Sequence, residues 1–293
     1  MLEIKHLTKT FGAFKALDDL TMTVPQGAVY GLVGPNGAGK TTAIRHITGV
    51  YRPDSGSVTL EGMDIYENIR AKARMGCIPD DLFFFNGASI NDMKKYYADI
   101  YPQFDGELFQ KVGEAFELPL KDPIRRFSKG MQKQAAFWLT IACRPDVLIL
   151  DEPVDGLDPV MRRQVWSMIL SDVADRGATV LVSSHNLREL EDICDHVGIM
   201  NHGKMLLERS LVDMQGSTVK VQLVGQIPDG LDILHQSHSG RLTTLVVRDS
   251  AERLQHKLSG EDLVYFDILP LSLEEIFIYE LGGVDYEIKN IIL

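Results

Sequence analysis

One nine-residue stretch, Gly34 to Thr42, restricts what this chain can fold into more than any other. It reads G-P-N-G-A-G-K-T-T and fits the phosphate-binding loop pattern G-x-x-x-x-G-K-[ST] in full. An apolar run at 28–33 precedes it, and a segment predicted as helical, 43–48, follows it. A strand, a glycine-rich loop and a helix in that order are the setting a phosphate site requires. This order disfavours the alternative of a flexible turn with a surface lysine.

Each residue type in this loop has a physical role in holding phosphate. The glycines let the backbone wrap an anion so that successive N–H groups point inward, and the helix start adds unpaired N–H donors and a positive dipole end. Lys40 can reach the β- and γ-phosphates of a nucleotide, and Thr41 can place its hydroxyl on Mg²⁺. The predicted nucleotide-binding residues of the loop are Gly34, Pro35, Asn36, Gly37, Ala38, Gly39, Lys40, Thr41 and Thr42.

Up to about residue 215, predicted strands alternate with predicted helices. Apolar runs at 75–79, 147–150 and 179–183 are typical of buried strands. Ser128 and Asp158 are good N-caps, and each precedes an amphipathic helical pattern. The alternation predicts an α/β fold with a mainly parallel sheet, and an aromatic-rich helical insertion is expected at about 82–142.

Two acidic residues, Asp151 and Glu152, come directly after the apolar strand at 147–150. Ligands bind at the carboxyl edge of such sheets. Asp151 is where a phosphate-loop protein places the acidic partner of its Mg²⁺, and Glu152 can polarise a water for attack on the γ-phosphate. His185 follows the next buried strand and could contact the same phosphate.

The composition limits the compartment and the partners. The formal charge of −11 argues against broad nucleic-acid binding, which needs clustered Lys and Arg. No apolar run is long enough to cross a bilayer, and no signal-peptide pattern opens the chain. The three cysteines have no metal-site spacing and are expected to be buried free thiols in a reducing cytosol.

The last part of the chain, 216–293, predicts a small α+β domain. Alternating segments at 219–223, 245–247 and 263–269 favour strands, and a helix is expected at 249–259 with Asp249 and Glu252 as a possible capping box. Ser272 and Glu275 are predicted to form a clearer capping box, and the helix that follows is expected to end at Gly282 and Gly283. This domain has no obvious catalytic cluster.

Over residues 2–215 the chain resembles the nucleotide-binding subunit of ABC transporters, and the motifs occur in the family's order. Residues 128–132 are similar to its signature motif, and 148–153 resemble its Walker B strand. Glu152 corresponds to the general base, and the remaining matches are the D-loop at Gly156, Leu157 and Asp158, the switch histidine at His185, and the adenine-stacking aromatic at Phe11. From the residues alone, a core side chain is the usual case for a Phe such as Phe11, and stacking on an adenine is the alternative.

The resemblance implies an ABC-type ATPase that uses ATP and Mg²⁺. Two such domains, identical or not, would pair head to tail and trap two ATP molecules, so that Ser128 and Gly130 act across the interface. Asp158 is a further residue expected to bind the nucleotide. Hydrolysis would drive export through a separate membrane permease. The resemblance therefore implies a cytoplasmic protein that is peripheral on the inner face of the membrane.

Two residues depart from the family's pattern. Asp80 stands after the strand at 75–79, where the family usually has Gln. A carboxylate there can still ligate Mg²⁺, which makes Asp80 a candidate metal ligand with Thr41 and Asp151; the alternative is a simple turn residue. Lys129 stands where the common signature has Gly, and it can point to solvent.

Several alternatives remain open at the level of sequence. The chain could be an ABC ATPase without a permease, acting in translation or DNA repair, or a nucleotide-binding module with weak hydrolysis. The 216–293 domain is expected either to regulate the ATPase or contact a second copy, or only to stabilise the chain. Three consecutive phenylalanines at 83–85 cannot all face inward, so part of this cluster is expected to meet a partner.

Overall fold

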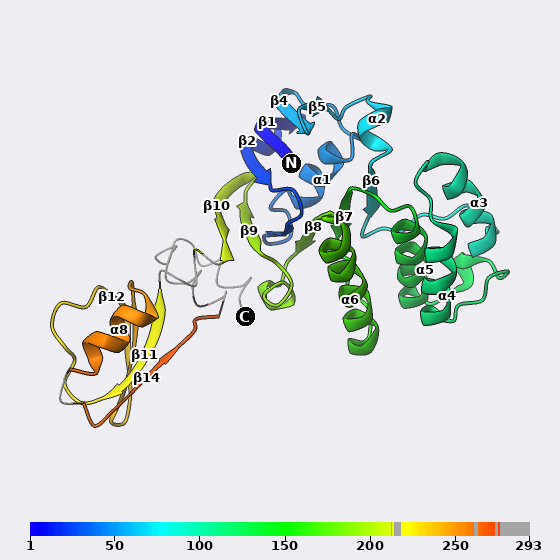
Figure 1. Cartoon of the computed structure of the whole chain (residues 1–293). Coiled ribbons are helices and arrows are strands. Elements are labelled where there is room, and N and C mark those ends of the chain that lie inside the picture. The colour runs from blue at the N-terminus through cyan, green and yellow to red at the C-terminus, as the bar shows by residue number, and fades with distance from the viewer. Residues whose placement is uncertain (212, 214–217, 261–262, 273–274, 276–293) are drawn as a thin grey trace. The chain divides into compact units, whose positions relative to one another are not determined.

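The computed structural model describes residues 1–211, 213, 218–260, 263–272 and 275, and the chain divides into two compact units (Figure 1). The first unit comprises residues 1–185 and 198–208, and the second comprises 186–197 and 209–293. The domain boundary expected at 215 lies outside the described residues.

A six-stranded sheet forms the centre of the first unit, in the order β10-β9-β3-β8-β7-β6. The pairs β3–β8, β8–β7 and β7–β6 are parallel, as the alternating pattern predicts. Every residue of β3, β7 and β8 is buried, because helices and the second sheet cover a parallel sheet on both faces. The strands are β3 (Val29–Val33), β6 (Met75–Ile78), β7 (Val147–Asp151), β8 (Thr179–Ser184), β9 (His196–Asn201) and β10 (Lys204–Ser210).

A second, antiparallel sheet in the first unit has the order β2-β1-β4-β5. Alternate side chains of its strands point into a core shared with the parallel sheet and with α1 (Lys40–Ile47). The remaining elements here are β1 (Leu2–Phe11), β2 (Phe14–Val24), β4 (Ser55–Leu60), β5 (Met63–Asp64) and α2 (Ile69–Lys72).

The helical insertion predicted at 82–142 contains α3 (Ile90–Ile100), α4 (Gly106–Phe116), a short 3-10 turn (Ile124–Arg126) and α5 (Lys129–Ala142). Figure 1 shows the three α-helices gathered together, and α3 and α4 both pack on α5. Gly113 allows α4 to approach closely, since a Cβ at this position would collide with the ring of Trp138 on α5.

The expected helix starts at Ser128 and Asp158 are confirmed. Ser128 Oγ accepts a hydrogen bond from Met131 N–H at 3.2 Å, and Asp158 caps α6 (Pro159–Arg176) by accepting from Val160 N–H at 2.9 Å. Both caps fix where the chain turns from a loop into a helix, and therefore fix the loops beside the carboxyl edge of the sheet.

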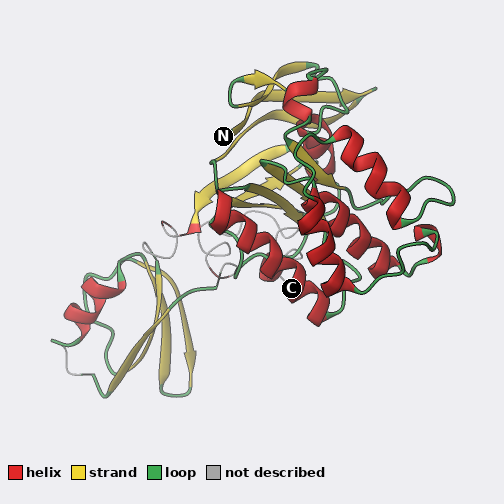
Figure 2. Ribbon diagram, turned by 45° about the vertical axis from the view of Figure 1, so that its right-hand side comes forward, coloured by secondary structure: helices red, strands yellow, loops and turns green. Residues whose placement is uncertain are grey.

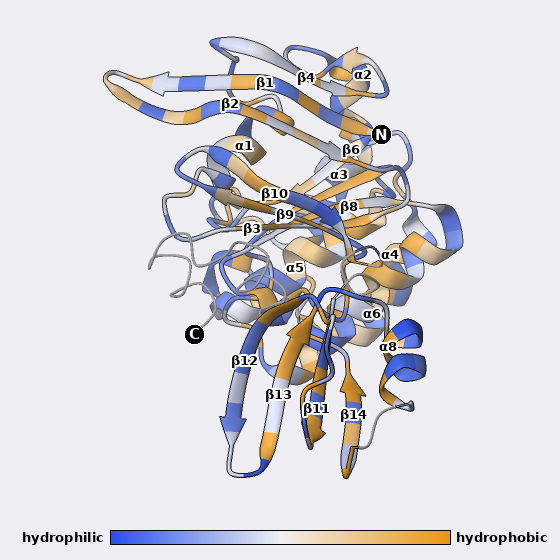
Figure 3. Cartoon of the chain, turned by 90° about the vertical axis from the view of Figure 1, so that its left-hand side faces the viewer, coloured by the Kyte–Doolittle hydropathy of each residue, from blue (hydrophilic) through white to orange (hydrophobic). Residues whose placement is uncertain are grey.

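The described part of the second unit holds an antiparallel sheet of order β12-β13-β11-β14 with one helix, α8, against it (Figure 2). Its elements are β11 (Val219–Val224), β12 (Ile233–Ser239), β13 (Leu242–Val247), α8 (Ala251–Leu258) and β14 (Tyr265–Leu269). Strand β12 is hydrophilic and mostly exposed (Figure 3), so it lacks the alternation that would have predicted it.

One capping prediction in this unit is wrong and another is confirmed. Ser250, not Asp249, caps α8, because its side chain accepts from Arg253 N–H at 3.4 Å while Asp249 bonds only to Ser250 N–H. Ser272 and Glu275 exchange the two bonds of a capping box, at 3.0 and 3.2 Å. The helix expected after them, up to Gly282 and Gly283, lies outside the described residues. Within the described chain, no helix combines the length and apolarity needed to cross a membrane.

Candidate active site

The phosphate-binding loop is built on glycines with left-handed backbone. Gly37 has φ 84° and Gly39 has φ 106°, and helix α1 begins immediately afterwards at Lys40. A Cβ on Gly39 would lie 2.9 Å from the carbonyl oxygen of Ala16. Both this steric clash and the positive φ therefore exclude a side chain at this position. The loop and the β2 strand enclose a cavity of about 190 Å³ lined by Phe14, Ala16, Pro35, Gly37, Ala38, Gly39, Lys40, Thr41 and Thr42.

The Lys40 side chain is buried, with only 6% of its surface exposed, and points back across the loop. Its ammonium donates to the carbonyl oxygen of Gly34 at 2.6 Å and lies 3.3 Å from Glu152 Oε1. A buried ammonium requires such partners, because removing a charge from water is costly. The loop lysine and the acidic residue after β7, far apart in sequence, are therefore in direct contact.

Asp151 ends β7 as predicted and is almost fully buried. Its Oδ1 accepts a 2.6 Å hydrogen bond from the hydroxyl of Ser183, which lies opposite it on β8. The Cys77 thiol lies close enough to sense this charge: burial raises its pKa to about 12, and Asp151 adds to the shift. Cys77 is therefore a protonated thiol at neutral pH. It is half-buried and not fully buried as predicted, whereas Cys143 and Cys194 are buried as predicted.

Glu152 has a left-handed backbone with φ 46°, which is uncommon for a residue with a side chain. The left-handed backbone turns the chain immediately after the end of β7. The N–H of Glu152 donates to Ser183 Oγ at 3.1 Å, and its carbonyl oxygen accepts from Lys133 Nζ at 2.8 Å. The conformation costs about 1–3 kcal/mol, and these two bonds hold it.

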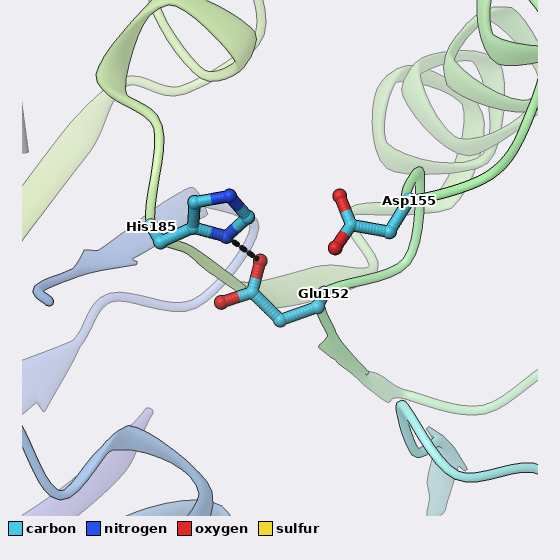
Figure 4. Close-up of side chains that lie close together, drawn as sticks. All are labelled: Glu152, Asp155 and His185. Atoms are coloured by element: carbon cyan, nitrogen blue, oxygen red, sulfur yellow. Dashed lines mark hydrogen bonds and ion pairs between the residues drawn. The ribbon is translucent and has the colours of Figure 1, made fainter. Parts of the chain in front are cut away.

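His185 contacts the Glu152 carboxylate through its Nδ1 atom, 2.9 Å from Oε2 (Figure 4). The carboxylate therefore lies between an ammonium on one oxygen and an imidazole on the other. Asp155 also faces this group: one ligand atom each from Glu152, Asp155 and His185 lies within 4.8 Å of the others. The structure thus brings the predicted residues Lys40, Asp151, Glu152 and His185 together.

The donors beside the loop suit Mg²⁺. This ion prefers hard oxygen ligands, and the site offers the Asp151 carboxylate and the Thr41 hydroxyl in the first turn of α1. The third expected ligand, Asp80, has a side chain that is 57% exposed, with Oδ1 4.0 Å from Lys133 Nζ. Partial burial raises the pKa of the Asp80 carboxyl, Lys133 lowers it, and Asp151 raises it further.

The signature and D-loop residues lie at the starts of two helices. Ser128 and Asp158 are exposed N-caps bonded to their own helices, α5 and α6. Gly130 lies beside the turn at Gly156, since a Cβ on Gly130 would be 3.5 Å from the Gly156 carbonyl oxygen. These residues form a surface beside the site, and the hydrogen bonds of Ser128 and Asp158 do not join them to the phosphate-binding loop.

Sequence reasoning missed four residues here. Ser183 and Lys133 hold the acidic pair, Asp155 faces His185, and Phe14 lines the cavity. The aromatic pair around the Gly-Ala turn at 12–13 is the sequence signal that points to Phe14. The role of Ser183 depends on the strand register that places it opposite Asp151, which only the structure shows.

The expected adenine-stacking residue Phe11 is 45% exposed and pairs across the hairpin with Phe14. Its ring packs edge-on against Tyr51, with centroids 5.6 Å apart. It is therefore not a core side chain, and both aromatic rings are available near the loop.

A strand, a phosphate-binding loop and a helix, with an acidic pair at the end of the parallel strand β7, which β8 separates from β3, define a P-loop nucleoside triphosphatase. The family model described as "ABC transporter" matches residues 17–155. The chain is 29% identical to the ABC transporter ATP-binding protein YtrB of Bacillus subtilis (strain 168), over 97% of this chain and 99% of that protein. It is 30% identical to the bacitracin transport ATP-binding protein BcrA of Bacillus licheniformis, over 97% and 98%.

Among solved structures, an ATP-binding subunit of an ABC transporter superposes with a TM-score of 0.68 at 27% identity, over 73% of this chain and 92% of that one. The chain belongs to the family of ABC transporter ATP-binding proteins. It is an ATPase subunit that binds ATP and couples its hydrolysis to transport, as the motif order implied, and these relatives favour transport over the alternative of a non-transport ABC ATPase.

Proposed function

We propose that this chain works as one half of a head-to-tail ATPase pair that drives export through a separate membrane permease. Each ATP would lie between the phosphate-binding loop of one copy and the Ser128–Gly130 segment of the other. The start of α5 suits this role, because free N–H groups and a positive dipole end would face a trianionic phosphate. Asp158 would lie at the same interface, and the pair is a homodimer or a heterodimer.

The observation that carries the proposal is the position of the Glu152 carboxylate. It lies 3.3 Å from the loop lysine and 2.9 Å from His185, beside a buried Asp151. A general base must stand next to the γ-phosphate, and the lysine marks where that phosphate is held. Glu152 would accept the proton of the attacking water, while His185 orients the carboxylate and Lys40 binds the phosphate.

Thr41 and Asp151 would hold Mg²⁺, which neutralises charge on the β- and γ-phosphates when bound. Ser183 orients Asp151 through its 2.6 Å hydrogen bond. Phe11 and Phe14 would bracket the adenine end of the nucleotide beside the cavity.

Export and the permease are inferred from two observations. Relatives named for bacitracin transport and for probable multidrug transport align with this chain at 30% identity. Phe83 and Phe85 are 71% and 45% exposed, whereas Phe84 is buried, which confirms that the three rings cannot all face inward. Phe85 also packs edge-on against Tyr96 of α3, so an aromatic surface is available for a membrane subunit.

For the 216–293 domain we propose regulation or contact with a second copy. Its β11–β14 sheet has its own buried core and contains no predicted site residue. A purely stabilising role is the alternative.

The test of the proposed function is Glu152→Gln. The amide keeps the shape but cannot accept a proton, so ATP binding should persist while turnover falls by several orders of magnitude. Dimers with bound ATP should then accumulate in size-exclusion chromatography. Unchanged turnover would refute the assignment of Glu152, and monomers at saturating ATP would refute the head-to-tail pair.

A further inference from the structure

Lys133 is a buried lysine that the function described above does not use. It lies on α5, five residues after the Ser128 cap, and only 7% of its surface is exposed. Burying an ammonium is unfavourable unless it has strong partners. Its Nζ donates to the carbonyl oxygen of Glu152 at 2.8 Å and lies 4.0 Å from Asp80 Oδ1.

The contact with Glu152 is made at an unusual point of the backbone. Glu152 is left-handed, with φ 46°, and in this conformation its carboxylate contacts Lys40 and His185. The peptide on one side is fixed by the Ser183 hydroxyl at 3.1 Å, and the peptide on the other side is fixed by Lys133. The hydrogen bond from the charged Lys133 ammonium is stronger than the bond to the neutral Ser183 hydroxyl.

Asp80 is placed to balance the charge of Lys133. It lies just after β6, the strand that pairs with β7, and its Oδ1 is 4.0 Å from Lys133 Nζ. Partial burial raises the pKa of Asp80, and Lys133 offsets only part of that rise. The Asp80 side chain is 57% exposed, whereas Asp151, the predicted magnesium ligand, is buried and bonded to Ser183. An acidic residue at position 80 therefore has a partner in this chain that is not a metal ion.

We propose that Lys133 is a positioning residue for Glu152, and that Asp80 is the counter-ion of Lys133 and not a ligand of Mg²⁺. The inference rests on the proposed role of Glu152 as general base. Lys133 acts through the backbone of Glu152 and does not touch the nucleotide. Asp80 in turn holds the ammonium over the Glu152 carbonyl, so its effect on hydrolysis passes through Lys133.

The experiment compares Lys133→Met, Lys133→Gln and Lys133→Arg by steady-state ATPase kinetics. Methionine keeps the stem length but donates no hydrogen bond, so kcat should fall about ten- to a hundred-fold, since small displacements of a catalytic group have effects of this size. The KM for ATP should stay within about two-fold, because the phosphate-binding loop is untouched. Arginine should restore most of kcat and glutamine a part of it. Lys111→Met, an exposed lysine of α4, is the matched control and should leave both constants unchanged.

Asp80→Asn is measured alone and combined with Lys133→Met, over a titration of Mg²⁺. Alone it should lower kcat about two- to five-fold, as suits a largely exposed ion pair, and leave the half-maximal Mg²⁺ concentration unchanged. In the Lys133→Met background it should have no further effect. A rise of about ten-fold in the Mg²⁺ requirement, present with or without Lys133, would overturn the assignment and make Asp80 a metal ligand.

The outcomes separate this inference from the proposed function. If Glu152→Gln abolishes turnover but Lys133→Met, Lys133→Gln and Lys133→Arg all turn over at the wild-type rate, the positioning role is wrong and the general base stands. Unchanged turnover in Glu152→Gln would refute both the general-base role of Glu152 and the positioning role of Lys133. If Lys133→Met fails to bind ATP, Lys133→Gln and the Asp80→Asn titration decide the question alone.

Discussion

Ser183 offers the sharpest test of how the site is built, because a single hydroxyl group supports both acidic residues. It is fully buried, donates to Asp151 Oδ1 at 2.6 Å and accepts from Glu152 N–H at 3.1 Å. Ser183→Ala leaves a buried carboxylate oxygen and a buried N–H without this partner. Each loss is worth about 1–3 kcal/mol, so the first unit should lose about 2–6 kcal/mol of unfolding free energy.

Urea unfolding followed by tryptophan fluorescence measures this loss. The chain has two tryptophans, Trp138 and Trp166, and both lie in the first unit, so the signal reports on that unit alone. With a slope of about 3 kcal/mol per molar urea, the midpoint should fall by about 0.7–2 M. Turnover should also fall, because Asp151 and Glu152 lose their shared anchor, whereas the control Ser167→Ala on the exposed side of α6 should change neither.

An unchanged midpoint together with unchanged turnover would refute the reasoning, since it would show that the two acidic residues do not depend on Ser183. A lowered midpoint with full turnover would limit the role of Ser183 to folding.

Three further predictions follow from contacts described above. Phe14→Ala should weaken ATP binding by about 1–3 kcal/mol if its ring stacks on the base, as measured by calorimetry; an unchanged dissociation constant excludes it. Gly113→Ala should destabilise the first unit by about 1–3 kcal/mol through overpacking against Trp138, and a stable variant would show that α4 can shift. Hydrogen bonds from Lys9 and Thr10 hold the pKa of Asp54 well below its usual range, so its carboxylate stabilises the fold above about pH 4 and this contribution is lost as the pH falls. The stability of Asp54→Asn should therefore approach that of the wild type in acid, and a constant difference between pH 7 and pH 3 would contradict the assignment.

Much of the first unit could be predicted because the structure that its short sequence patterns favour is also the structure that the packed fold requires. The glycine loop, the apolar strand before Asp151 and the cap at Asp158 each follow from residue types within a short window. The parallel sheet then places the ends of β3, β7 and β8 at one edge. The pairing of Lys40 with Glu152 follows from that topology.

The remaining features depend on contacts that no local pattern records. Lys133 is an unremarkable polar residue in a helix until α5 packs beside the Glu152 carbonyl. Strand β12 is missed because its exposed polar residues lack the alternation of a half-buried strand. The misplaced cap of α8 arose because Asp249 and Ser250 are adjacent and both are good N-caps; the backbone selects Ser250.

The left-handed backbone at Glu152 also limits how such a site can change in evolution. Asp, Asn and Gly tolerate this conformation best, while β-branched residues are strongly disfavoured. A descendant that lost hydrolysis but kept its shape is therefore expected to carry one of those three residues at this position. Among these three residues, Asp would keep the carboxylate but on a side chain one methylene shorter. Hydrolysis would then be lost because the carboxylate no longer reaches the attacking water, and not because the carboxylate itself is gone.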